Sequence, residues 1–402
     1  MNRVLKFLGV FLLAVLVVFG GIIGFYWKSF STFFDNRAGL MEGTEWVSKT
    51  QSLRGLSEYV AQNPQNVSLA SVVVTAQDSA IYYQEDQPRT LGALANFFIL
   101  TAYADLIQKG TFSSDETIEW DEISVYQLPD VDQAAHTESY NYAKEAGWMD
   151  DGSIKLSDAL QLLVIFNDLA LADYLWWNID REYWSDLKEN LSLTETEMPL
   201  PFSGLYIAIS PDIQERATSE IVENWPSTDS DEFRNHIAEQ SNRIVQEGSD
   251  RDQIIDFMKD YRLGNTFMEE RDALALFPKT TAKEMVQIMQ RLWENELINS
   301  EVSEQVKSWM RWQIEDQPEL KTDFTDYGAL FDTRMGLLNG IDFGTSAYTG
   351  DTTVQVLFFD KIPIGFWFHM SSLLMHQDFQ QRLIFDPALI EQVQKELDHN
   401  SR

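Results

Sequence analysis

Few side chains in this sequence have the types and spacing that chemistry requires. No cysteine is present, which excludes disulfides and thiolate metal sites. The histidines show no metal-ligand spacing, so neither a metal nor any other cofactor is predicted. The five histidines are His136, His236, His369, His376 and His399.

Two serines have neighbours that would suit nucleophilic chemistry. Ser185 and Lys188 form a Ser-x-x-Lys pair, which would place an amine beside a hydroxyl. One such match is expected by chance, and this one lies in a polar segment. Ser139 and Asn141 form a Ser-x-Asn pair, which we expect in a loop before a buried helix. Ser346 has no adjacent base. These serines stay open as alternatives.

The composition limits the number of domains and the kinds of partner that the protein can have. With 402 residues and 44% hydrophobic content, the chain can fill one large domain or two ordinary ones. Its 12 tryptophans indicate a well-filled core, and a sugar-stacking surface is the alternative. The net charge is −33, and because residues 1–28 carry +3, the other 374 carry −36. Such a surface repels nucleic acid and anionic lipid, so no nucleic-acid partner is predicted.

The amino terminus predicts the location. From Phe7 to Trp27 the chain has 21 residues without a charge, which as a helix span about 30 Å, the thickness of a bilayer core. A cleaved signal peptide is the alternative, but its apolar region is shorter and ends in small residues. We therefore predict a cytoplasmic tail at 1–6, a transmembrane anchor at 7–27 and a tether at 28–50. The main domain is then periplasmic or extracellular.

Periodicity along the rest of the chain predicts strands near both ends and helices between them. The elements expected before residue 200 are a helix from about residue 51, a hairpin of strands at 68–76 and 79–86, a helix at 93–109 and one buried helix at 156–177. Those expected after it are polar surface helices within 204–275, two helices at 280–313 with Thr281 as cap, strands at 352–360 and 363–372, and a helix at 386–399. This order predicts an α/β fold, an α+β sandwich whose antiparallel sheet is built from both chain ends, with a mainly helical lobe inserted in the middle.

Four stretches carry a resemblance to the penicillin-recognising serine hydrolases, specifically the class A β-lactamase branch. They are YYQEDQPRTLGALANFFILTAYADLIQKGTFSSDETI, LQLLVIFNDLALADYL, TTAKEMVQIMQRLWENELINSEVSEQVKSWM and GTSAYTGDTTVQVLFFDKIPIGFWFHM. The spacing is similar across 51–396, apart from 204–275, which looks like an insertion near the family's omega loop. The resemblance implies the β-lactamase-like fold and a serine nucleophile with a lysine or glutamate base.

At the motif positions the resemblance implies lost chemistry. The family's Ser and Lys correspond to Ala93 and Asn96, which offer neither nucleophile nor base. The Ser-Asp-Asn triplet corresponds to Phe166, Asn167 and Asp168. The Lys-Thr-Gly triplet corresponds to Tyr348, Thr349 and Gly350, and its tyrosine lacks the charge that holds a substrate carboxylate.

Charge and backbone define the expected cleft. Asp168 and Asp351 would repel an anionic ligand, at a cost of about 4 kcal/mol for a like charge about 4 Å away. Backbone N–H groups at positions 93 and 351 would retain an oxyanion-hole geometry. Thr349 and Gly350 would let a ligand pair along a strand edge. The omega-loop glutamate stays unassigned between Glu195 and Glu197.

The sequence therefore predicts a membrane-anchored, extracytoplasmic pseudoenzyme of the β-lactamase-like fold. It would act by binding or scaffolding at the cell envelope, with peptidoglycan peptide or another envelope protein as its partner. One alternative is an active serine hydrolase, of β-lactamase or D-Ala-D-Ala peptidase type, with a displaced nucleophile. The other is an unrelated anchored binding domain.

Overall fold

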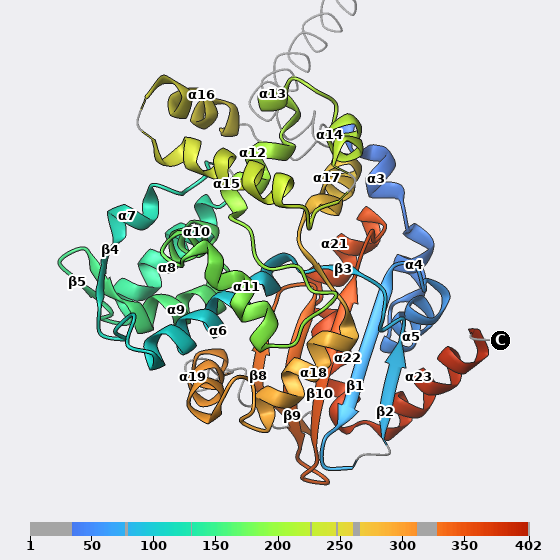
Figure 1. Ribbon diagram of the computed structural model, residues 1–402. Coiled ribbons are helices and arrows are strands. Elements are labelled where there is room, and N and C mark those ends of the chain that lie inside the picture. The colour runs from blue at the N-terminus through green and yellow to red at the C-terminus, as the bar shows by residue number, and fades with distance from the viewer. Residues whose placement is uncertain are drawn as a thin grey trace, which may run out of the picture.

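A five-stranded antiparallel sheet forms the centre of the protein (Figure 1). The computed structural model describes residues 34–76, 79–129, 131–225, 227–246, 248–259, 266–311 and 328–400. The strands, in spatial order, are β2 (Ala80–Tyr83), β1 (Val67–Val73), β10 (Thr352–Phe359), β9 (Gly340–Ser346) and β8 (Ala329–Met335). Strand β1 pairs with β10, so the predicted sheet from both chain ends is confirmed.

Alternate residues of each strand enter two different cores, as the twofold side-chain period requires. Along β10, Val354, Val356 and Phe358 enter the larger core, whereas Leu357 and Phe359 enter the smaller one. On the larger side lie α18 (Ala282–Trp293), α19 (Ser300–Met310) and, behind them, α6 (Ala95–Gln108). On the other side lie α5 (Leu53–Gln62), α21 (Ile364–Ser372), α22 (Met375–Phe385) and α23 (Pro387–Asn400).

A helical lobe surrounds α6 and shares the larger core (Figure 1). It contains α7 (Trp120–Ser124), α8 (Gln133–Glu145), α9 (Leu156–Phe166), α10 (Leu169–Trp177), α11 (Arg181–Asn190) and α12 (Phe202–Ile209). Two small sheets complete it: β3 (Arg89–Thr90) with β7 (Lys279–Thr280), and β4 (Thr117–Glu119) with β6 (Ser153–Lys155) and β5 (Met149–Asp150).

The single helix predicted at 156–177 is wrong, because the chain forms two helices there. Asn167 adopts the left-handed conformation, with φ of 52°, and ends α9. Asp168 then begins α10, and its side chain accepts the Leu171 N–H at 3.0 Å. An aspartate at this position satisfies a backbone donor that the helix itself leaves unpaired. The break brings Asp168 to the start of a helix.

The strand predicted at 363–372 is also wrong, since this segment forms α21. Pro363 stands at its N-terminal cap, and its residues pack against α3 (Arg37–Met41) and α4 (Thr44–Lys49). A Cβ on Gly365 would lie 2.4 Å from the Leu40 carbonyl oxygen, so this close approach requires glycine. Tertiary packing therefore overrides the strand preference of the aromatic residues.

The tether predicted at 28–50 is wrong for the residues that the structure describes, because α3 and α4 are packed helices. Trp46 is buried and lies edge-on to Tyr59, with ring centroids 5.0 Å apart. The Arg271 guanidinium lies 2.8 Å from the Glu42 carboxylate. The predicted anchor at 7–27 lies outside the described residues, and among those described no helix is long and apolar enough to cross a membrane.

The region 204–275 is helical, as predicted, and its helices have between four and 15 residues. After α12 come α13 (Pro211–Gln214), α14 (Thr218–Asn224), α15 (Asp231–Val245), α16 (Ser249–Met258) and α17 (Phe267–Ala273). Helix α15 packs on α12, and both bury apolar side chains in the larger core, among them Phe233 and Leu205. The segment therefore extends the main core in addition to covering it.

Candidate functional site

Ala93 and Asn96 lie where α6 begins. Ala93 is half-buried in the 3₁₀ turn Gly92–Leu94, and Asn96 lies in the first turn of the helix. The Asn96 side chain is fully buried, and neither its Nδ2 nor its Oδ1 has a hydrogen-bond partner in the part of the chain that the structure describes. A methyl group and a neutral amide therefore stand where the resemblance implies a nucleophile and a base.

The end of strand β8 lies next to this turn. A Cβ on Gly336, directly after β8, would lie 2.8 Å from the Leu94 Cδ2 atom. Asn339, in the turn between β8 and β9, donates from Nδ2 to the Thr90 carbonyl oxygen at 2.9 Å. The start of α6 and the β8–β9 turn therefore form one end of the candidate site.

Three residues predicted to line this cleft lie elsewhere. Thr349, Gly350 and Asp351, like Tyr348, occupy the turn between β9 and β10, which follows the opposite end of β9 from Gly336. Strand β9 has seven residues, so about 20 Å separates the two ends at about 3.3 Å per residue. The Asp351 carboxylate instead accepts a hydrogen bond from Thr75 Oγ1 at 2.8 Å.

The prediction that these residues share a cleft with Ala93 and Asp168 is therefore wrong. The strand that ends beside Ala93 is β8, whereas the Thr-Gly pair in the sequence predicts that the β9–β10 turn borders the site. Strand β8 does carry a cation, Arg334, two residues before Gly336. Its guanidinium, however, donates to the Gly336 carbonyl oxygen at 2.9 Å and lies opposite Asp342.

The Arg334 side chain faces α22 rather than α6. Its strand partner Asp342 accepts a hydrogen bond from Gln380 of α22 at 2.8 Å, whereas the adjacent Met335 enters the larger core with α6. Burial raises the pKa of the Asp342 carboxyl to about 8, although the Arg334 charge acts to lower it. This pair therefore supports the sheet and does not present its charge to the Ala93 end.

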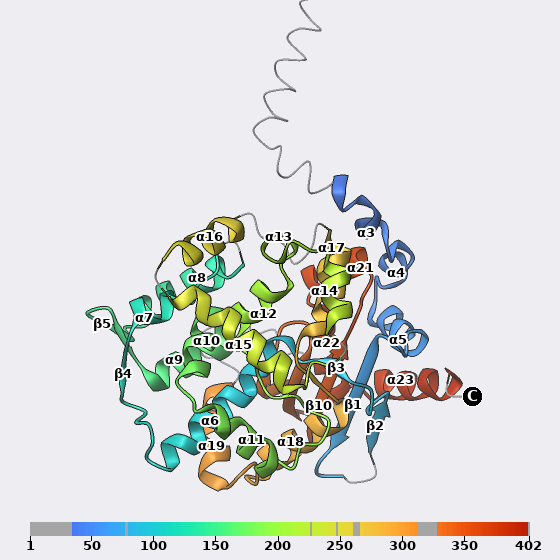
Figure 2. The ribbon, with the colours of Figure 1, turned by 45° about the horizontal axis from the view of Figure 1, so that its top comes forward.

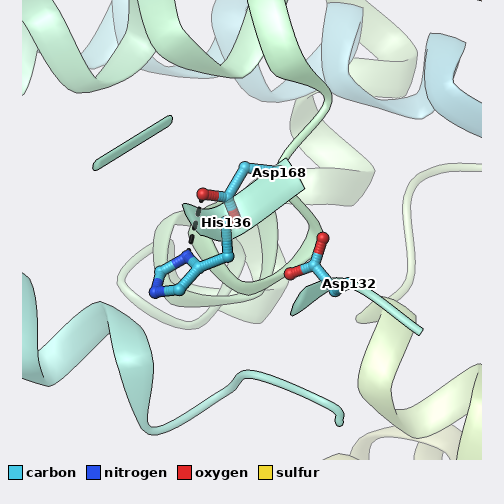
Figure 3. A group of neighbouring side chains, drawn as sticks. All are labelled: Asp132, His136 and Asp168. Atoms are coloured by element: carbon cyan, nitrogen blue, oxygen red, sulfur yellow. Dashed lines mark hydrogen bonds and ion pairs between the residues drawn. The ribbon is translucent and has the colours of Figure 1, made fainter. Parts of the chain in front are cut away.

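A second group of polar side chains lies in the helical lobe (Figure 3). His136 of α8 places Nδ1 2.9 Å from the Asp168 Oδ2, and its Nε2 lies 3.0 Å from Ser124 Oγ. Trp120 stacks on the imidazole, with ring centroids 5.0 Å apart. Asp132, at the start of α8, completes the group. Asp132, His136 and Asp168 are all buried.

The two carboxylates of this group hold the N-terminus of α10. Asp132 accepts the N–H groups of Leu169 and Ala170 at 3.1 and 2.9 Å, and Asp168 accepts that of Leu171. Burial and the neighbouring Asp168 raise the pKa of the Asp132 carboxyl to about 8. The positive end of a helix favours negative charge at such a place. With the His136 contact, each oxygen of the Asp132 and Asp168 carboxylates therefore has a hydrogen-bond partner.

The same geometry permits two kinds of chemistry. Ligand atoms of Asp132, His136 and Asp168 lie within 4.8 Å of one another, a spacing that would suit a divalent metal. The order Ser124 Oγ, His136 and Asp168 is that of a serine nucleophile, a base and the carboxylate that orients it. However, Ser124 ends α7 and its hydroxyl donates to the Trp120 carbonyl oxygen at 3.0 Å. A helix C-terminus presents carbonyls, which do not stabilise an oxyanion.

The sequence reasoning missed this group, because Asp168 follows His136 by 32 positions. The available signal was the Asp132–His136 spacing of four on a helix, which places both on one face. The other candidate serines are placed differently. Ser139 lies in α8 and not in a loop, so that prediction is wrong. Lys188 of α11 lies 3.7 Å from Asp229, forming an ion pair.

The loop glutamates are engaged in holding β7 and α18. Glu197 accepts the Lys279 N–H at 3.1 Å and a hydrogen bond from Thr228 Oγ1, and burial raises the pKa of its carboxyl. The Glu195 N–H donates to Glu284 of α18 at 3.0 Å. These contacts fix the loop that follows α11.

The comparisons with known proteins give one family. A sequence model of the beta-lactamase enzyme family matches residues 237–342. The matched residues run from α15 to the start of β9 and include α18, α19 and β8, about a quarter of the chain. The resemblance inferred from the sequence is thus confirmed, while the stretches around Ala93 and Phe166 lie outside the matched residues. No curated protein matches this chain.

Three of the solved structures that match are named beta-lactamases. That of Sphaerobacter thermophilus is 11% identical, with a TM-score of 0.47 over 82% of this chain and 95% of its own. That of Burkholderia vietnamiensis is 10% identical, with a TM-score of 0.47 over 82% and 94%. The chromosome-encoded enzyme of Vibrio parahaemolyticus is 11% identical, with a TM-score of 0.45 over 87% and 98%.

Proposed function

We propose that this protein is a non-hydrolysing relative of the beta-lactamases that binds a partner at the cell envelope, held there by an anchor at residues 7–27. The observation that carries the proposal is the start of α6, where the resemblance implies a nucleophile and a base and the chain has Ala93 and the buried Asn96, whose amide has no partner among the described residues. Neither group can take up or release a proton during acyl transfer.

The β8 end of the sheet supports a binding role. Among the described strands β8 is the terminal one beyond β9, and beyond the bridge that Arg311 makes to Thr333 a terminal strand offers backbone donors and acceptors to an added strand. Its end lies beside the Ala93 turn, so an extended peptide laid along it would reach the site. We propose the peptide part of peptidoglycan, or an extended segment of an envelope protein, as the partner.

The test is acylation of the full-length protein in detergent. A chromogenic β-lactam and a fluorescent penicillin are offered to the wild type, with an active class A beta-lactamase as the positive control. We expect neither colour change nor covalent label. A labelled wild-type protein would overturn the proposal, and peptide mapping would then identify the nucleophile.

A second candidate function is a serine hydrolase that uses Ser124, because the Ser124–His136–Asp168 distances of 3.0 and 2.9 Å suit proton transfer. A fluorophosphonate probe separates the candidates. Label on the wild type that is lost in Ser124→Ala and kept in Ser139→Ala would support the hydrolase. An unlabelled wild type would exclude it, and label kept in Ser124→Ala would point to another serine.

A further inference from the structure

One corner of the molecule exposes large apolar side chains from two distant parts of the sequence. Phe34 and Met41, at the start and end of the first described helical segment, are 66% and 62% exposed. Trp367 and Phe368 of α21 are 37% and 40% exposed. We call these four residues the apolar corner. Soluble surfaces seldom gather such residues without a function.

Contacts through Phe267 and Asn36 link the two parts of the apolar corner. The Trp367 and Phe368 rings lie 4.7 Å apart, and Phe368 lies 5.6 Å from Phe267 at the start of α17. The Phe267 N–H donates to the Asn36 side chain, two residues after Phe34. Both views show α3 and α21 side by side (Figures 1 and 2). The two parts of the corner therefore lie on neighbouring helices that pack together.

The chain that precedes Phe34 identifies what covers this corner. The uncharged stretch 7–27 ends seven residues before Phe34, and seven residues span at most about 25 Å. If that stretch crosses the bilayer, as the proposed function holds, Phe34 must lie close to the bilayer surface. No second apolar segment of that length occurs in the sequence.

The chemistry of the corner fits the same neighbour. Tryptophan and phenylalanine favour the interface between lipid headgroups and acyl chains. The part of the chain beyond residue 28 carries −36, so electrostatic attraction to anionic lipid cannot hold the domain against a membrane. Contact must therefore come from burial of apolar side chains.

We propose that the apolar corner rests in the bilayer interface and fixes the orientation of the domain on the membrane; the proposal rests on the proposed anchor at 7–27. Helix α21 follows β10, and the Phe359 N–H donates to Asn339 Oδ1 at 2.7 Å, so α21 begins at the same end of the sheet as the Ala93 turn. That end of the sheet then faces the membrane, and the β9–β10 turn with Tyr348 faces away from it.

The absence of cysteine makes a direct test practical. Full-length Met41→Cys and Tyr348→Cys are each labelled with bimane and reconstituted into phosphatidylcholine vesicles with or without brominated lipid. Tyr348 is 72% exposed and serves as the matched control position. We expect brominated lipid to quench the Met41→Cys label several-fold more strongly than the Tyr348→Cys label, with a blue shift at Met41→Cys alone.

A second comparison tests the aromatic residues. Trp367→Ser with Phe368→Ser in the Met41→Cys protein should reduce this quenching, while flotation with vesicles and the melting temperature stay unchanged. Tyr82→Ser, an exposed tyrosine of β2, is the matched control and should change neither.

The outcomes separate the two proposals. Flotation with equal quenching at both labels overturns the apolar-corner proposal and leaves the anchor standing. A protein that does not float overturns both. An unlabelled Met41→Cys protein that forms a disulfide with a second copy shows that protein covers the corner and also overturns the proposal.

Discussion

Arg334 of β8 and Asp342 of β9 lie opposite each other in the sheet with both side chains buried, at 4% and 0% exposure. The Arg334 charge acts to lower the pKa of the Asp342 carboxyl, but burial outweighs it and raises that pKa to about 8. The pair lies behind the strand end that borders the Ala93 turn. Arg334 donates to the Gly336 carbonyl oxygen, so it supports the strand end that borders the candidate site.

Arg334→Met should destabilise the protein, because it removes the hydrogen bond to the Gly336 carbonyl oxygen and the charge that acts to lower the pKa of Asp342. The expected loss in the free energy of unfolding is about 1–3 kcal/mol. Arg334→Met combined with Asp342→Leu should cost less than Arg334→Met alone. Urea denaturation of the four members of this cycle measures the coupling. Equal losses in the single and the double variant would show that Arg334 and Asp342 are not coupled.

Stability should fall as the pH rises from about 5 to about 8. The pKa of Asp132 is raised to about 8, against an unfolded value of about 4, so in this range the folded state binds more protons than the unfolded state. The contribution of Asp132 to the free energy of unfolding is fully present below pH about 4 and is lost as the pH rises through about 8. Asp132→Asn should flatten the melting temperature against pH, whereas the exposed Asp121→Asn should not. A melting temperature that rises over this range would contradict the assignment.

Asn96→Leu should stabilise the protein or leave it unchanged. The buried amide of Asn96 has no hydrogen-bond partner among the described residues, and such a group costs about 1–3 kcal/mol. Thr101→Val, on the same helix, is the matched control because Thr101 Oγ1 donates to the Phe97 carbonyl oxygen at 2.8 Å and should lose stability. Urea titration gives both values. A large loss on Asn96→Leu would show that the amide has a partner.

Ala93→Ser with Asn96→Lys should not create a beta-lactamase. Phe166 still supplies no hydroxyl, the Arg334 charge still faces α22, and catalytic groups that act as a unit are strongly non-additive. Mass spectrometry after incubation with a penicillin should show no adduct on residue 93. An adduct in the double variant would show that the remaining groups suffice for acylation.

Salt should stabilise the protein in detergent. With −36 beyond residue 28, the folded surface repels itself, and ions screen this repulsion. The melting temperature should rise as NaCl increases from a few millimolar. A curve that stays flat or falls would show that charge repulsion does not limit stability.

Local sequence patterns predicted the helices and strands whose own residues determine whether they are helical or extended. The β-branched runs of β1 and β10 were recognised, and the Thr281 cap is confirmed, since its hydroxyl accepts the Glu284 N–H at 3.2 Å. Helix α21 was mistaken for a strand because its form depends on Gly365 packing against Leu40, which no local pattern contains.

The site was harder to predict for the same reason. Ala93 and Asn96 could be named from spacing on one helix, and the structure places both at its start. The Tyr348 turn was wrongly joined to them, because a Thr-Gly pair indicates a strand edge without saying which strand lies beside α6. The His136 group depends on contacts between three separate helices.

The pairing of β1 with β10 has a consequence for biosynthesis. Asn66, just before β1, donates to Lys361, just after β10, and these residues are 295 positions apart. A ribosome must therefore translate nearly the whole chain before β1 acquires its inner neighbour, and until then the hairpin of β1 and β2 exposes an open edge. Contacts this distant in sequence slow folding, so the nascent domain is prone to aggregation until β10 has been synthesised.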